Sequence, residues 1–223
     1  MLLFQSKQND LRQTANQPLK IVTPLGNITL LLDAGAGNLL DHHHTCHQFQ
    51  SGGYIYTWAY EHMRIEMIMS YPVIELPTHM QVDGHCGLLI RFMNLESELS
   101  LKCVAYWSEH QWITGGSSTG QYLEASTWED DHYYVSIGTE DTEALHNRIH
   151  ANKLMPIAIQ EKQELTFSDM NRVGIYLPSI ESHHICQFHF YIAWKRYTDP
   201  EDVDTWYAVD QQADLILKYE ECF

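Results

Sequence analysis

The sequence predicts a mainly β protein, an antiparallel β-sandwich or barrel-like single domain with one clear α-helix. Segments rich in β-branched and aromatic residues recur along the chain, turn-forming residues separate them, and only residues 139–153 have a clear helical pattern. With 44% hydrophobic residues, the 223-residue chain can bury the core of one domain spanning residues 1–223. Residues 1–17 are expected to form a loosely ordered N-terminal segment.

The first expected element is a β-hairpin within residues 19–35. Two apolar, strand-like runs flank the turn-forming pair Gly26 and Asn27, and Pro24 ends the first of them. A glycine-rich break at residues 34–38 precedes the sequence HHHTCHQ, which is expected to lie in a loop. Further strands are predicted over residues 54–60, 62–70, 87–95, 99–107, 121–127, 132–138, 154–159, 172–180, 183–196 and 204–210.

Some of these segments carry a more specific expectation. Residues 87–95 and 99–107 are expected to pair as a hairpin through a short charged turn. The sequence GGSSTG at residues 115–120 is interpreted as a flexible loop. Residues 183–196 are apolar on both faces, as in a central strand that is covered on each side. Residues 211–223 could form either a strand or a short helix.

The predicted helix covers residues 139–153. Acidic residues occupy its first turn, and Arg148 and Lys153 lie near its end, so the charges at both ends complement the helix dipole. Leu145 and Ile149 are four residues apart and give a narrow apolar stripe that would pack on a sheet. The charges in this segment are therefore explained by helix formation.

The charge of the chain is strongly negative and unevenly distributed. Thirteen Lys and Arg residues oppose 29 Asp and Glu residues, which gives a formal net charge of −16 at pH 7. Between residues 21 and 147 the basic residues are Arg64, Arg91 and Lys102, against sixteen acidic residues. Such a field repels nucleic-acid phosphates, so nucleic acid is not expected as a partner. It favours a basic protein, a cation or a neutral small molecule.

Cysteine usage and the N-terminal sequence predict a cytoplasmic protein. An odd number of irregularly spaced cysteines argues against a secreted disulfide framework. The sequence MLLFQSKQNDLRQ lacks the basic and apolar regions of a signal peptide, and no apolar run is long enough for a membrane span. No membrane association is therefore expected. The cysteines are Cys46, Cys86, Cys103, Cys186 and Cys222.

Histidines concentrate in three places and suggest a metal site. Imidazole and thiolate groups are good ligands for zinc and other transition metals. The candidate ligands are His44, His47 and His85, with His183, His184 or His189 as alternatives. Three such ligands would leave one coordination position of a zinc ion open, as in a catalytic zinc site. The spacing matches no specific metal motif, and no paired CxxC or HExxH occurs. No cofactor is required, although zinc, iron or another transition metal could be held.

A sugar-binding surface is a further alternative. Aromatic rings stack on sugar faces, and Trp107, Trp112 and Trp128 lie close to acidic residues that could act as acid and base. The acidic sequence at residues 129–131 lacks the spacing of a calcium loop. The three tryptophans are therefore candidate ligand-binding residues of a carbohydrate-binding module.

Three functional hypotheses follow from these patterns. The preferred one is a non-catalytic, acidic binding protein that recognises a basic protein partner or a neutral small ligand. The reason is that the sequence contains no catalytic motif. No catalytic residues are therefore assigned. The alternatives are a metal-dependent enzyme with a histidine-lined site and a carbohydrate-binding module. Charge segregation is the observation that favours the first hypothesis.

Overall fold

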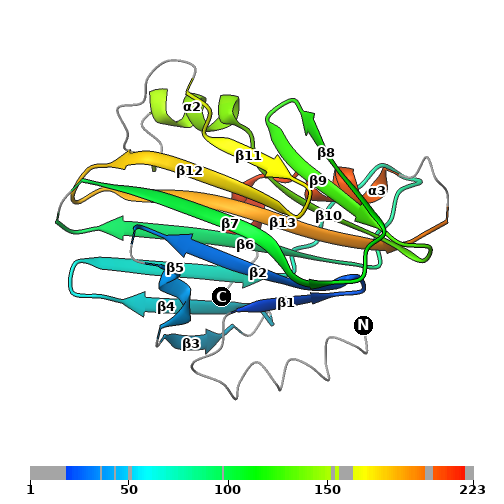
Figure 1. The fold of residues 1–223 in the computed structure, drawn as a ribbon, viewed down its shortest axis with the longest axis horizontal. Helices are drawn as coiled ribbons and strands as arrows, with labels where there is room; N and C mark the ends of the chain where they lie inside the picture. Colours follow the sequence, from blue (N-terminus) through cyan, green and yellow to red (C-terminus); the bar gives the residue numbers. More distant parts are fainter. Residues whose placement is uncertain are drawn as a thin grey trace.

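Two antiparallel β-sheets form the protein (Figure 1). The computed structural model describes residues 19–35, 37–42, 44–49, 52–96, 98–151, 154–155, 163–198 and 203–218, so the predicted N-terminal segment 1–17 lies outside the described residues. The five-stranded sheet has the order β1 (Lys20–Thr23), β2 (Gly26–Asp33), β7 (Leu99–His110), β12 (Arg172–Ile180) and β11 (Thr166–Asp169). The eight-stranded sheet has the order β3 (Thr45–Gln48), β4 (Tyr54–Ala59), β5 (Met63–Ser70), β6 (Gly84–Asn94), β13 (Ile185–Arg196), β10 (Tyr133–Glu140), β9 (Leu123–Glu129) and β8 (Thr114–Gly120).

The sheets pack face to face around one large apolar core. Alternate residues of each strand point inward, as Ile28, Leu30 and Leu32 do in β2, and all three are fully buried. The described strands do not close into a barrel, because each sheet ends in two edge strands. The prediction of a mainly β, sandwich-like fold is therefore confirmed, and the barrel alternative is not adopted.

The outer face of the eight-stranded sheet is covered by two short helices, α3 (Asp204–Val209) and α4 (Ala213–Lys218). They lie directly on sheet glycines: a Cβ at Gly138 would come 2.8 Å from Val209, and one at Gly87 would come 2.7 Å from Ile216. The central strand β13 thus has the core on one face and these helices on the other, which explains its two apolar faces as predicted.

Helix α2 (Thr142–His150) confirms the predicted helix with shorter bounds than residues 139–153. The Asp141 side chain accepts a hydrogen bond from the amide of Ala144, so the helix begins three residues later than predicted. Leu145 is fully buried, in agreement with the apolar stripe. None of the helices in the described part of the chain is long and apolar enough to cross a membrane.

Three predictions about local structure are wrong. Residues 87–95 and 99–107 do not pair with each other, because β6 belongs to the eight-stranded sheet and β7 to the five-stranded one. The sequence GGSSTG is part of strand β8, not a loop, because small side chains let Trp128 and Trp206 pack over Gly115 and Gly120. Residues 204–210 form helix α3 because Thr205, Ala208 and Val209 share one buried helical face.

Two smaller corrections concern the first third of the chain. The β1–β2 turn is made by Pro24 and Leu25, since Thr23 pairs with Gly26 and Asn27 is already in β2. HHHTCHQ is not wholly a loop: it follows a short 3-10 helix, η2 (Leu39–Asp41), and includes strand β3. Of the predicted strand 154–159, residues 156–159 lie outside the described residues.

Candidate functional site

The described histidines of HHHTCH lie against different aromatic rings. Of the rings that they contact, Trp58 lies in β4, Tyr60 directly follows β4, and Phe49 directly follows β3. Their ring-centroid distances are 5.8 Å from His42 to Tyr60, 4.9 Å from His44 to Trp58 and 6.0 Å from His47 to Phe49. His43 lies outside the described residues.

His85 is far from this cluster. The register aligns His47 with Leu89 across three strand spacings, and His85 lies four residues further along β6. At ordinary sheet spacings the Cα atoms of His47 and His85 are then roughly 20 Å apart. The His85 Nε2 instead lies 2.6 Å from the Pro72 carbonyl oxygen.

The alternative histidines are also engaged elsewhere. His184 lies 3.4 Å from the Glu181 carboxylate, and His183 adopts a left-handed backbone conformation at the turn before β13, with φ 63°. His189 is buried against Glu140. Within the described ranges, no three His, Cys, Asp or Glu side chains converge to hold a metal ion. The metal site of His44, His47 and His85 stays a prediction that the arrangement of these residues does not support.

The three predicted ligand-binding tryptophans do not form a platform. Trp107 and Trp128 are 4% and 0% exposed, and their rings meet edge to face in the core, 5.5 Å apart. Trp112 is half-buried and stacks on His110 at 4.3 Å. An exposed stacking surface for sugars is therefore not available from Trp107 and Trp128.

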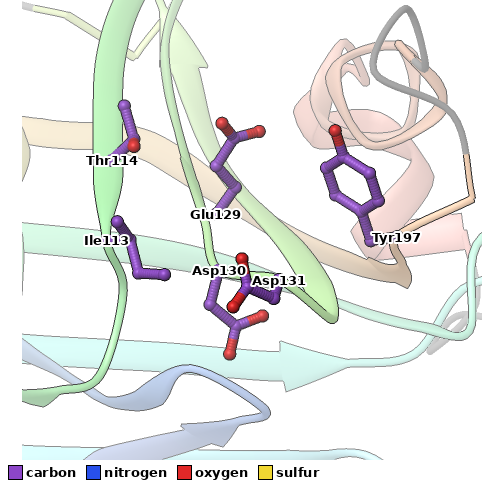
Figure 2. A pocket seen from close by; sticks show the side chains of 6 residues that line it. All are labelled: Ile113, Thr114, Glu129, Asp130, Asp131 and Tyr197. Carbon is purple, nitrogen blue, oxygen red and sulfur yellow. The ribbon is translucent and has the colours of Figure 1, made fainter.

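The structure instead has an acid-lined concavity at one end of β8 and β9, on the outer face of the eight-stranded sheet. This acidic depression has a volume of about 220 Å³ and is lined by Ile113, Thr114, Glu129, Asp130, Asp131 and Tyr197. Figure 2 shows the acidic side chains between Thr114 on one side and the Tyr197 ring on the other.

The backbone around the acidic depression is held in place by the turn between β9 and β10. Asp130 Oδ1 accepts hydrogen bonds of 2.7 Å from the amides of His132 and Tyr133. The Tyr197 amide donates to the His132 carbonyl at 2.6 Å, and the Tyr197 ring stacks on Tyr134 with centroids 4.7 Å apart. Asp130 therefore fixes the turn, while Glu129 and the exposed Asp131 supply charge to the concave surface.

Seven of the described basic side chains contact partners away from the depression, whereas the exposed Arg196 lies next to Tyr197 in sequence. Lys20, Arg64, Arg148, Arg172 and Lys195 lie against Glu109, Glu66, Glu140, Asp169 and Asp204, respectively. Arg91 donates to Gln187, and Lys102 lies over the Phe167 ring. Among the described side chains, none of the ion pairs involves the acids of the depression.

Sequence reasoning noted the acids at residues 129–131 but grouped them with tryptophans. Tyr197, Ile113 and Thr114 come from distant segments, and no motif links them to the acids. The observable signal was the charge density of the β9–β10 turn, where three consecutive acids occur without a nearby Lys or Arg in sequence.

Comparisons with known proteins do not place the chain in a family. No family model and no curated protein matches the sequence. Among solved structures, the chain is similar to one described as "Putative kojibiose phosphorylase from human microbiome", with 11% sequence identity and a TM-score of 0.48. The match covers 88% of this chain, which spans 28% of that protein's length.

Proposed function

We propose that the protein is a non-catalytic binding protein that captures a basic segment of a partner protein at the acidic depression. The observation that carries the proposal is a concave surface whose carboxylates, Glu129, Asp130 and Asp131, have no basic neighbour among its lining residues. Clefts lined by charge of one sign concentrate oppositely charged ligands and speed their association.

A basic side chain suits this surface better than the alternatives. A neutral ligand would partly desolvate the carboxylates without supplying an opposite charge, which is unfavourable. A bare metal ion is disfavoured because the described acids do not converge as ligands. A Lys or Arg side chain can approach one carboxylate at a time, and the Tyr197 ring adds an aromatic wall beside its aliphatic stem.

The overall charge of the protein acts in the same direction. The net charge of −16 attracts a basic partner from a distance and repels nucleic acid. Dissolved salt shortens the range of both effects. We therefore expect association to be fast at low ionic strength and to slow as salt is added, because the long-range part of the attraction is screened.

Binding of a labelled lysine-containing peptide tests the proposal. The probe is a nine-residue peptide of alternating valine and lysine, capped at both ends, followed by fluorescence anisotropy at low salt. We compare a site variant, Glu129→Gln with Asp131→Asn, with a control variant, Glu61→Gln with Glu75→Gln. Asp131, Glu61 and Glu75 are exposed, and Glu129 is half-buried. Each variant removes two negative charges. Asp130 is left intact because it holds the turn.

The site variant is expected to bind the probe about tenfold more weakly, a loss of about 1.4 kcal/mol. The control variant should lose much less, since its charges are remote and exposed. Equal losses in the two variants would show that only net charge matters and would refute the acidic depression as the site. Absence of probe binding to the unmodified protein would refute the proposed function itself.

A further inference from the structure

We infer that the edge strand β8 recognises the backbone of the basic segment, which adds to the eight-stranded sheet as a further β-strand beside the acidic depression. This inference rests on the proposed function and specifies how the partner is bound. It identifies the ligand as an extended segment of a basic protein, with Lys or Arg at alternate positions.

Strand β8 is an edge with no strand on its outer side in the described part of the chain. It pairs with β9 from Thr114 to Gly120 and is the last strand of the eight-stranded sheet (Figure 1). An edge strand presents a row of unpaired N–H and C=O groups to its outer side. Those groups are the recognition elements used when an extended peptide adds to a sheet.

Strand β8 lacks the features that usually protect an edge. Its sequence, TGGSSTG, has no charged residue and no proline, although both commonly prevent edge pairing. It has seven residues, whereas the other edge strands, β1, β3 and β11, have four each. It is therefore the longest and least protected edge among the described strands.

One glycine of β8 has no packing explanation. A Cβ at Gly115 would meet Trp128 at 2.3 Å, and one at Gly120 would meet Trp206 at 2.7 Å, so core packing accounts for both. A Cβ at Gly116 would have no heavy atom within 4 Å. Glycine inside a strand weakens it and often marks the close approach of another backbone. Gly116 is consistent with such an approach.

The acidic depression is within side-chain reach of a strand added to β8. Thr114 lines the depression and pairs with Glu129 in the next strand. A new strand beyond β8 would lie two strand spacings, or about 10 Å, from β9. A lysine or arginine on its outer face can span that gap together with the Glu129 side chain. Backbone pairing would thus supply affinity, and the carboxylates would select basic side chains at alternate positions.

Charge selects the occupant of the edge. A second copy of this chain could pair edge to edge through β8, but each copy carries a net charge of −16. The mutual repulsion of two such copies opposes self-association. A segment that carries positive charge relieves the same repulsion, so it is the favoured occupant.

The test uses selectively N-methylated versions of the valine–lysine probe. One peptide is methylated at every valine amide and the other at every lysine amide, so both keep all their positive charges. In a β-strand, alternate N–H groups point to opposite edges, so only one of the two methylated sets would face β8. We expect one methylated peptide to bind like the parent and the other to bind at least about tenfold more weakly. Amide hydrogen exchange in residues 114–120 should slow when the parent peptide is bound.

The outcomes separate this inference from the proposed function. If both methylated peptides bind like the parent, edge pairing is refuted while recognition by charge stands. If both lose binding, or if exchange slows at β1, β3 or β11 but not at β8, the segment does not pair with β8. If the parent peptide itself does not bind, the inference and the proposed function fall together.

Discussion

The imidazole Nδ1 of His189 lies 3.5 Å from the carboxylate Oε2 of Glu140 in the interior of the protein. The other ring nitrogen, Nε2, lies 2.8 Å from the carbonyl oxygen of Gln211, to which it donates. Arg148 contacts the same carboxylate, so Glu140 connects β10, β13 and α2.

This buried cluster predicts acid-dependent stability. Burial alone would raise the Glu140 pKa, but the hydrogen bond and charge of His189, with the charge of Arg148, hold that pKa below its usual value of 4.5. The unfolded chain therefore binds more protons than the folded protein when the pH is near or below 4.5. The stabilising contribution of Glu140 is complete above that pH and is lost as the pH falls through the Glu140 pKa of the folded state.

Replacing Glu140 tests that cluster. Glu140→Gln should destabilise the protein by about 3 kcal/mol near neutral pH, because Arg148 then lacks its largely buried counter-charge. Its stability should also depend less on pH in the acid range than that of the unmodified protein. Urea unfolding over a pH series measures both effects, and Glu75→Gln, at an exposed loop position, serves as the control. An equal acid dependence in Glu140→Gln and the control would contradict this prediction.

The ion pair of Lys195 and Asp204 should stabilise the protein more than an exposed pair of equal length. Lys195 Nζ and Asp204 Oδ2 are 2.6 Å apart with side chains 12% and 9% exposed, and Arg172 and Asp169 have the same separation at 42% and 41% exposure. We expect Lys195→Gln to cost about 3 kcal/mol and Arg172→Gln less than about 1 kcal/mol. Chemical denaturation of the two variants compares them directly, and similar losses would refute the role assigned to burial.

Two adjacent glycines of β8 should respond differently to alanine. A methyl group at Gly115 would come 2.3 Å from the buried Trp128, so Gly115→Ala should destabilise the protein by about 1–3 kcal/mol. Gly116→Ala adds a methyl group in open space and should be neutral or slightly stabilising. Thermal unfolding distinguishes the two variants. A large loss in Gly116→Ala would show that its Cβ is restricted by a contact that the structure does not contain.

The cysteines should differ sharply in reactivity toward a thiol reagent. Cys46 is exposed, whereas Cys86, Cys103 and Cys186 are buried. Burial raises the pKa of Cys86 and of Cys186 to about 12 and also raises the pKa of Cys103, which disfavours their thiolates. In a Cys222→Ser background we expect one fast-reacting thiol in the folded protein, and Cys46→Ser should abolish it. Fast reaction of a second thiol would contradict the buried assignments.

Much of the fold could be predicted because strand periodicity is a local property. Alternating apolar residues indicated β5, the long apolar run indicated the covered central strand β13, and end charges with one apolar stripe indicated α2. The pairing of strands was less predictable. The segments that became β6 and β7 are adjacent in sequence and strand-like, but nothing local to them specifies that the chain crosses from one sheet to the other between them.

The site was only partly predictable, because surface position depends on tertiary packing. The acids at residues 129–131 stood out by charge alone, but Tyr197 and Thr114 join them only through the β8–β9–β10–β13 arrangement. Trp107 and Trp128 were predicted to bind sugars because acidic residues lie near them in sequence, but both are buried in the core. A tryptophan contributes large apolar area in either place, so its sequence context does not distinguish a core position from an exposed one.

The sequence by itself determined the mainly β class, the position of α2 and the strongly negative charge, because propensity, periodicity and composition act within short segments. Tertiary structure decided that TGGSSTG is an edge strand and that residues 204–209 form a helix, since both depend on contacts with distant residues. It also placed His42, His44 and His47 against separate aromatic rings and positioned the acidic depression beside β8. Packing brings residues distant in sequence into contact, and local sequence preference cannot specify such contacts.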